Sequence, residues 1–303
     1  MRITNNLIQR SSISSLQSSL QMVDKARADV STGRRIRRMS DDPSSASEVV
    51  RSSSSLRALD QYRRNIKMGQ GRATAEEGVL NQLTNTLTRG IELALGQYSS
   101  TATADTRTIT KAEIDQLIDS TVSLGNTKFG DDYLFGGTRG NERPLRNPAV
   151  GTDPFTNLLD ASSAPVNPSG SIRIEISDGH FINPNHNATE VFLDSGALQA
   201  LRDLSTALGA NDTAGIDTAM HTLQTSNDRV QTLIGTQGAR GSEFLVTSDQ
   251  LSAQEVSITT YRSDLRDIEI EKAMIELAGR TTGYQAAMTA TSKVLGLSLA
   301  NCL

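Results

Sequence analysis

The stretch "STGRRIRRMSDDPSSASEV", residues 31–49, places four arginines within five positions and follows them with two aspartates and a proline. We call residues 34–45 the charged knot. Proline suits the first position of a helix, and an aspartate before it can accept the free backbone N–H groups there. The stretch therefore predicts that one segment ends at the arginines and that a new helix begins at Pro43, with Asp42 as its N-cap.

The prolines show where the chain leaves the helical pattern. Pro43 stands alone, and the other six lie between residues 144 and 184. Because a proline inside a helix costs about 3 kcal/mol, both flanks can be helical, whereas the middle cannot. The expected order is helix, irregular or β-rich insert, helix.

Apolar residues recur at spacings of three and four in both flanks, which is typical of a coiled-coil seam. The first flank lacks only one seam position, which Arg27 fills. A long helix at each end predicts that the two termini pack together. The seam residues are Ile13, Leu16, Leu20, Val23 and Val30 near the N-terminus, and Ile258, Leu265, Ile268, Ile275, Tyr284, Met288 and Leu295 near the C-terminus.

The insert contains three stretches that indicate short strands. They are "YLFGGT" (133–138), "SIRIEIS" (171–177) and "TEVFLD" (189–194). Apolar and polar residues alternate in the second, and the Asp178–Gly179 pair after it favours a hairpin turn. The expected fold class is mainly α with a β insert: long coiled-coil-like arms, a helical rod and a small antiparallel β domain.

The bulk composition restricts the function classes. The chain of 303 residues carries 30 basic and 34 acidic side chains, a net charge of -4, which argues against nucleic acid or an anionic membrane as main partner. Its single cysteine, Cys302, excludes an intrachain disulfide and a cysteine zinc cluster. No apolar run has the length of a membrane span or a Sec-type signal peptide.

Polar residues weaken the predicted seams. Arg27, Arg63 and Lys272 occupy seam positions, so an isolated pair of helices buries little apolar surface. At roughly 25 cal/mol per Å², that burial barely offsets an ordering cost of about 1.5 kcal/mol per residue. We expect the ends to become ordered when neighbouring subunits supply the missing surface. The alternative is an ordinary helical bundle that is stable alone.

Several motifs, in their order along the chain, resemble the flagellin family and within it the hook-associated protein 3 branch, the junction proteins between flagellar hook and filament. They are "MRITNNL" (1–7), the stretch quoted above, "QYRRNI" (61–66), "GDDYLFGGTRG" (130–140), "GARGSEF" (238–244), "DLRDIEIEKAMIEL" (264–277) and the C-terminal "YQAAMTATSKVLGLSLANCL" (284–303). The likeness extends nearly end to end apart from the insert. Two departures are the residues 267–271, where the family usually has small side chains, and the less apolar C-terminus.

The resemblance implies an axial protein built in layers. Residues 1–42 and 256–303 would form the coiled-coil arms of an inner core, 43–135 and 197–255 a helical rod domain, and 136–196 an outer β-rich domain. It implies secretion through the flagellar type III export apparatus to the hook–filament junction. The implied partners are hook-associated protein 1, flagellin, further copies of this chain and an export chaperone at the C-terminal helix, with no nucleic acid and no membrane.

The candidate assembly residues are the seam positions given above together with the charged side chains of the knot. The knot contributes Arg34, Arg35, Arg37, Arg38, Asp41 and Asp42. We expect its arginines to meet carboxylates of a neighbouring subunit. We expect no catalytic residue, cofactor or metal.

Two other functions remain open. A filament flagellin would share the same motifs. A metal-dependent hydrolase would need the histidines of "SDGHFINPNH" (177–186), His180 and His186, as ligands, although their spacing matches no known motif and the third histidine, His221, lies on a separate predicted helix. The glycines of "GTQGARG" (235–241) lack the strand and lysine of a phosphate-binding loop, and we interpret them as helix punctuation.

Overall fold

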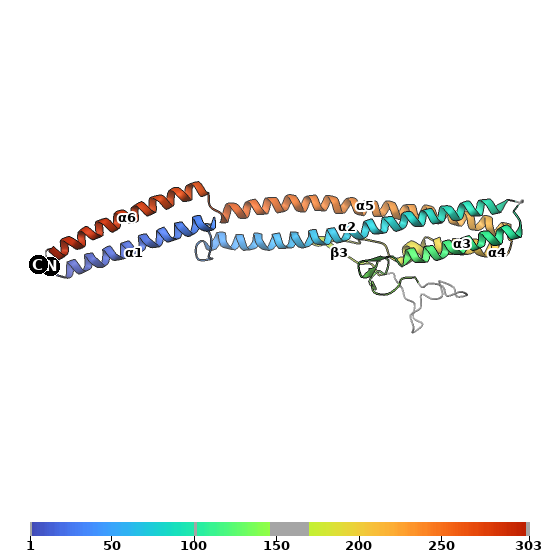
Figure 1. Ribbon diagram of the computed structural model, residues 1–303, viewed down its shortest axis with the longest axis horizontal. Helices are drawn as coiled ribbons and strands as arrows, with labels where there is room; N and C mark the ends of the chain where they lie inside the picture. Colours follow the sequence, from blue (N-terminus) through green and yellow to red (C-terminus); the bar gives the residue numbers. More distant parts are fainter. Residues whose placement is uncertain (1, 100–101, 146–169, 301–303) are drawn as a thin grey trace. The chain divides into compact units, whose positions relative to one another are not determined.

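The computed structural model describes residues 2–99, 102–145 and 170–300, without the side chains of residues 2–6, 8, 9 and 294–300. The chain divides into two compact units. Unit 1 comprises Met1–Ala58 and Ala253–Leu303, and unit 2 comprises Leu59–Ser252. Two long helices, α2 (Pro43–Tyr98) and α5 (Thr213–Arg266), contribute to both units (Figure 1). The predicted class, mainly helical with a small β component, is confirmed.

Unit 1 consists of the two ends of the chain. Helices α1 (Arg2–Thr32) and α6 (Ile270–Ala300) lie side by side (Figure 1), which confirms the predicted pairing of the termini. Their sequences are rich in Ser, Thr and Ala, so the contact buries few large side chains. Among the side chains described here, the buried apolar ones of unit 1 are only Ala26, Ile36 and Ala46.

The start of α2 has the predicted cap. The helix begins at Pro43, and the Asp42 carboxylate accepts the backbone N–H of Ser45 (3.2 Å) and its hydroxyl (2.7 Å). One of the backbone donors that a helix start leaves free is thereby satisfied. Asp42 is thus the N-cap that the sequence predicts.

Unit 2 holds the hydrophobic core of the molecule. Leu80, Leu83 and Leu87 of α2 are fully buried, because their spacing of three and four places them on one face. That face packs with α3 (Ala104–Gly125), α4 (Ala197–Gly209) and α5. α3 and α4 lie against each other. The core thus joins helices that are distant in sequence.

Gly69 allows a close approach between α2 and its neighbours in unit 2. A Cβ atom at this position would lie 2.5 Å from Cδ1 of Ile174 and 2.7 Å from Cζ of Phe244. Both distances are well below van der Waals contact, so only glycine fits here without a shift of buried side chains. Phe244 is fully buried on α5.

The insert forms two antiparallel two-stranded sheets in the described residues. β1 (Lys128–Phe129) pairs with β2 (Asp132–Tyr133), and β3 (Ile174–Ser177) pairs with β4 (His180–Ile182). The predicted turn at Asp178–Gly179 joins β3 to β4, with Gly179 at φ 70°. Within the alternating stretch 171–177, the second part, Ile174–Ser177, therefore forms the predicted hairpin strand, whereas residues 171–173 lie outside it. Prolines 148, 154, 165 and 168 lie outside the described residues.

Three local predictions are wrong. "TEVFLD" forms a π-helix, η1 (Thr189–Asp194), because its adjacent Val191 and Phe192 are both buried, whereas a strand would point them to opposite faces. In "YLFGGT" only Tyr133 belongs to a strand, since Leu134 and Phe135 both enter the core. The glycines at 235, 238 and 241 lie within the continuous helix α5 and do not interrupt it.

No helix in the described part of the chain combines the length and apolar character needed to cross a membrane.

Candidate assembly site in the terminal helices

The chain leaves the helical conformation at two places in unit 1, and these two breaks are hydrogen-bonded to each other. The N–H of Arg35 donates to the carbonyl of Arg266 (2.8 Å), and the N–H of Ile268 donates to the carbonyl of Gly33 (3.1 Å). Arg34 and Asp267 form an isolated antiparallel bridge. We call residues 33–42 and 266–269 the joint. The partner of the charged knot is therefore the end of α5.

Two knot arginines are engaged within the chain. The Arg35 guanidinium donates to the carbonyl of Leu265 (2.8 Å) and lies 3.5 Å from Asp42. Arg37 forms an ion pair with Asp29 of α1 at 3.2 Å. Both contacts hold the joint together, so these arginines have a role inside the subunit that the sequence did not indicate.

The other two knot arginines are exposed. Arg34 is close enough to Asp267 to contribute to the lowered pKa of that carboxyl, after the larger effect of a hydrogen bond from Arg266. Arg38 has no carboxylate within ion-pair distance in the described part of the chain; only its backbone is bound, by Asp41. Arg38 is thus the knot cation most available to another molecule.

The two aspartates of the knot accept hydrogen bonds that fix the backbone of the knot. The Asp41 carboxylate accepts the N–H groups of Arg38 (2.9 Å) and Arg37 (3.0 Å), and these bonds lower the pKa of Asp41. Hydrogen bonds from Ser45 and Ser44 place the pKa of Asp42 well below its usual range. Both carboxyl groups are therefore charged at neutral pH. Their role here is to fix the turn and the helix start.

Ile36 is the buried residue of the knot that sequence analysis missed. Its side chain is 7% exposed although arginines flank it on both sides. The sequence does contain an indication of this burial, because a single isoleucine between two pairs of arginines can act as a small apolar anchor in a charged segment. The joint thus combines a buried isoleucine with a shell of hydrogen bonds.

A mixed-charge cavity of about 600 Å³ borders the joint. Its charged lining is mostly paired within the chain: Lys272 with Glu269 (2.7 Å), and Asp267 with Arg266 (2.7 Å). No group of His, Cys, Asp and Glu in the described residues has an arrangement that could hold a metal ion. The charges of this cavity are therefore largely used for internal pairing.

The predicted seam of α1 separates into two stripes. Leu16, Val23 and Val30 are half-buried, whereas Ile13 and Leu20 are 48% and 41% exposed. Ser12 and Ser19, the neighbours of the exposed pair, are the half-buried positions instead. Three of the five predicted seam residues of α1 are thus partly shielded within the chain, and the other two are exposed.

The C-terminal seam shows the same separation. Ile258, Leu265, Ile268 and Tyr284 are half-buried, whereas Ile275 and Met288 are exposed, Ile275 by 73%. Leu295 lies on α6, but its side chain is outside the described residues. The terminal helices therefore leave several large apolar side chains without cover inside the subunit.

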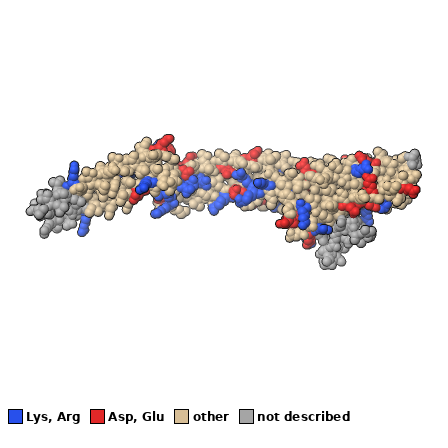
Figure 2. All heavy atoms as spheres, viewed as in Figure 1, with Lys and Arg blue, Asp and Glu red and all other residues tan. Residues whose placement is uncertain are grey.

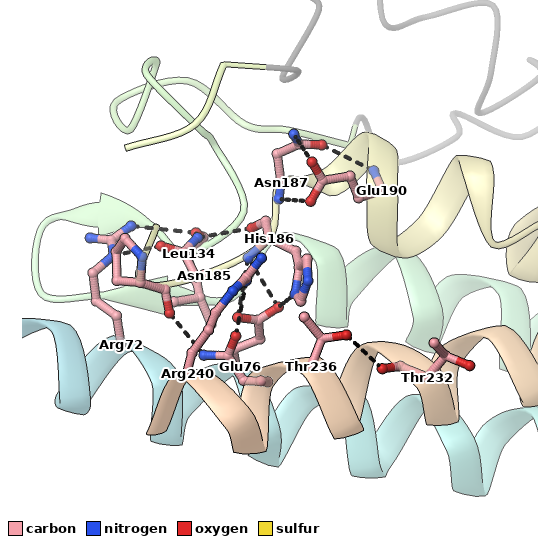
Figure 3. A network of polar contacts seen from close by, with 12 residues as sticks. Arg72, Glu76, Leu134, Asn185, His186, Asn187, Glu190, Thr232, Thr236 and Arg240 are labelled. Carbon is pink, nitrogen blue, oxygen red and sulfur yellow. Dashed lines mark hydrogen bonds and ion pairs between the residues drawn. The ribbon is translucent and has the colours of Figure 1, made fainter. Parts of the chain in front are cut away.

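The two histidines of the insert occupy different environments. Nδ1 of His186 lies 2.7 Å from the fully buried Glu76 carboxylate, which also accepts the backbone N–H of His186 (Figure 3). His180 is exposed and lies 3.2 Å from Glu243 on α5. His221 of α5 is likewise exposed, 3.9 Å from Asp217. Each histidine has its own carboxylate, so the structure does not bring the proposed metal ligands together.

Glu76 and His186 belong to a buried polar network that ties the insert to α2. Arg72 of α2 donates to the side chain of Asn185 (3.1 Å), and Asn185 donates to the carbonyl of Leu134 (2.6 Å). Burial lowers the pKa of Arg72, which Asp132 and Glu76 oppose. Figure 3 shows these side chains converging from the helix and the insert. The network therefore has a structural role, because its polar groups satisfy one another.

This chain is similar in sequence to known flagellar proteins. Residues 3–139 match the family described as the bacterial flagellin N-terminal helical region. The chain is 24% identical over 312 residues to flagellar hook-associated protein 3 of Escherichia coli (strain K12), covering 99% of this chain and 98% of that one. It is 25% identical over 296 residues to a flagellin of Bacillus subtilis (strain 168), covering 95% and 94%.

A solved structure shares the fold. The putative flagellar hook-associated protein from Vibrio parahaemolyticus has a TM-score of 0.63 and 18% identity, and the match covers 75% of this chain and all of that one. The relatives support a structural role in the flagellum and a location there. The match to the flagellin N-terminal helical region and the near end-to-end alignments make this chain similar to proteins of the flagellin family, flagellar hook-associated protein 3 among them.

Proposed function

We propose that this chain is a structural subunit of the junction between the flagellar hook and the filament. The observation that carries the proposal is the uncovered apolar surface of unit 1. Among the described side chains, twelve of the nineteen large apolar ones that are exposed belong to this unit. A structural subunit can cover such side chains only by packing against its neighbours. The similarity to flagellar hook-associated protein 3 supports the junction position.

The exposed stripes define how neighbours would pack. Ile13 and Leu20 on α1, with Ile275 and Met288 on α6, are available to the terminal helices of adjacent subunits. Such packing extends the coiled-coil seam beyond the single pair of helices. Growth by stacking requires heterologous contacts, because an isologous dimer would end it. The residues 1–42 and 256–303 would then form the inner core of the assembly.

The remaining layers follow the same proposal. Residues 43–135 and 197–255 would form the rod, and residues 136–196 the outer domain. Hook-associated protein 1 would bind on the hook side, flagellin on the filament side, and an export chaperone would cover the C-terminal helix before secretion through the type III apparatus. The exposed Ile270, Met274 and Ile275 of α6 support the last contact, since an apolar helix face is what a helix-binding groove recognises.

Gene deletion tests the junction role. In the deletion strain we expect flagellin to appear in the medium while hooks remain on the cell without filaments, and the full-length chain supplied in trans should restore the filaments. A variant with Ile13→Ser and Leu20→Ser is a matched test of the α1 stripe and should fail to restore them. Filaments that persist on hooks in the deletion strain would refute the junction role.

A filament flagellin is the second candidate, because the Bacillus subtilis flagellin matches with an identity as high as that of the junction protein. Purified chain separates the two functions. A junction subunit should form at most short assemblies, whereas a filament subunit should grow long filaments from seeds. Long filaments of this chain alone, seen by electron microscopy, would favour the second function.

A further inference from the structure

The two units of the chain carry opposite net charges. Unit 1 has 15 basic and 11 acidic side chains, and unit 2 has 15 basic and 23 acidic ones. The net charge of -4 for the whole chain is thus the sum of a basic unit and a strongly acidic unit. Opposite charge on two surfaces of one chain favours association between copies, because complementary patches steer and orient an encounter.

The basic surface of unit 1 centres on the charged knot. The N-terminal part of the unit, residues 1–58, contains ten basic and five acidic side chains. In Figure 2, lysine and arginine side chains gather over the segment between α1 and α2 and over the beginning of α2. Arg35 and Arg37 are used in the joint, whereas Arg34 and Arg38 project as exposed cations.

The acidic surface of unit 2 includes an uncovered face of α3. Residues 105, 109, 112, 116 and 119 of this helix are exposed, and their spacing of three and four places them on one side. This α3 face carries two carboxylates, Asp105 and Asp119, and a 73% exposed isoleucine, Ile109. Neither carboxylate has an ion-pair partner in the described part of the chain, and Figure 2 shows carboxylates gathered over this region of the unit.

The opposite side of α3 is buried or paired within unit 2, whereas the α3 face is exposed. On that side Arg107 and Ile114 are buried, and the helix packs on α4. Glu113 is paired with Arg89, and Asp115 with Lys111, so these acids are used within unit 2. The α3 face therefore combines free negative charge with a large exposed apolar side chain. A partner surface with basic side chains and an exposed apolar side chain would complement both features of the α3 face.

We infer that the α3 face of one copy docks on the charged knot of a second copy of this chain. Arg34 and Arg38 supply the complementary charges, and the 65% exposed Met39 beside them supplies an apolar contact for Ile109. The two surfaces differ, so a pair of copies keeps one surface of each kind open after a contact forms. The contact is heterologous, and it gives a short, closed assembly where the rotation from copy to copy closes. This inference deepens the proposed function, because it rests on stacking of copies and names the surfaces involved.

Charge exchange tests the contact on the full-length chain. The first variant, Arg34→Glu with Arg38→Glu, makes the knot acidic; the second, Asp105→Lys with Asp119→Lys, makes the α3 face basic. In sedimentation velocity at low salt, we expect each variant alone to associate about tenfold more weakly than the wild-type chain. An equimolar mixture should recover wild-type association, because each acidic knot then meets a basic face and each basic knot an acidic face.

Two controls make the outcome specific. Glu77→Lys with Asp249→Lys changes the charge by the same amount at exposed positions on α2 and α5, and it should leave association unchanged. Association of the wild-type chain should also weaken with added salt, since screening shortens the range of such pairs to about 8 Å at physiological ionic strength. Circular dichroism checks that both charge variants retain the helices.

A mixture that associates no better than its two components would overturn the inference, as would a wild-type chain that does not self-associate. If the charge variants associate normally and still restore filaments in a deletion strain, the α3 contact is wrong and the junction role stands. If the wild-type chain itself does not restore filaments, the proposed function is wrong, whatever the sedimentation result.

Discussion

Units 1 and 2 are both mainly helical, yet they differ in where their apolar side chains lie. Of the 36 buried apolar residues among the described side chains, 33 belong to unit 2 and three to unit 1. Two of those three are alanines. Unit 2 therefore has a core that can stabilise it alone, whereas unit 1 has too little buried surface to offset the ordering of its helices. The difference supports the proposal that unit 2 provides stability and unit 1 provides the contacts for assembly.

The largest effect should follow from removing a core side chain of unit 2. Phe244→Ala deletes a fully buried ring, and we expect a loss of about 4 kcal/mol in the free energy of unfolding. Urea unfolding followed by circular dichroism measures it. Leu16→Ala, at a half-buried position of α1, is the matched change in unit 1 and should cost about 1 kcal/mol. Equal costs would contradict the difference between the units.

The polar network of unit 2 should give the next largest effect. Glu76→Ala leaves the buried His186 without its acceptor and removes a negative charge that favours the buried Arg72, and removing one partner of a buried pair costs about 3 kcal/mol. His180→Ala is the control, because its contact with Glu243 is exposed and should contribute less than about 1 kcal/mol. If both substitutions have the same effect in urea unfolding, the network does not anchor the insert.

The exposed stripe of unit 1 should show the opposite behaviour. Ile13→Ser with Leu20→Ser should change the unfolding free energy of the monomer by less than about 0.5 kcal/mol, because both side chains are already exposed. Assembly should be lost, since the substitutions remove apolar surface that neighbours would cover. The two measurements are urea unfolding and sedimentation. A large loss of monomer stability would mean that the stripe packs within the subunit.

The smallest effect concerns the pH response of the joint. The pKa values of Asp41, Asp42 and Asp267 are all lowered by hydrogen bonds in the folded chain. A lowered pKa stabilises the fold fully above the unfolded value of about 3.9, and the contribution disappears as the pH falls through the folded value. NMR titration should therefore show these carboxyls still mostly ionised at about pH 3.9, where an ordinary aspartate is half protonated. Titration of Asp42 at the ordinary value would show that the cap is not formed in solution.

The sequence predicts the local features of the joint but not its tertiary contacts. The cap at Asp42 and the helix start at Pro43 depend on neighbouring residues, so the pattern is sufficient. The hydrogen bonds between Arg35 and Arg266 join positions more than 200 residues apart, and no local pattern encodes them. For the same reason the internal roles of Arg35 and Arg37 were not expected.

The register of the terminal seam could not be predicted for a different physical reason. The stripe through Ile13 and Leu20 and the stripe through Ser12 and Ser19 are adjacent on α1, and the periodicity only shows that an apolar stripe exists. It does not tell which stripe faces α6 and which faces another molecule. In the insert, "TEVFLD" is too short for periodicity to distinguish a strand from a buried helical turn. The boundaries predicted for the five segments stay a prediction.

Hydrogen exchange measured by mass spectrometry on free and assembled chain tests the central claim most directly. In the free chain, the amides of α1 and α6 should exchange rapidly while those of α2 and α5 within unit 2 are protected; in the assembly, the terminal helices should become protected as well. If the terminal helices of the free chain are already as protected as the unit 2 core, unit 1 is complete by itself and the account is wrong.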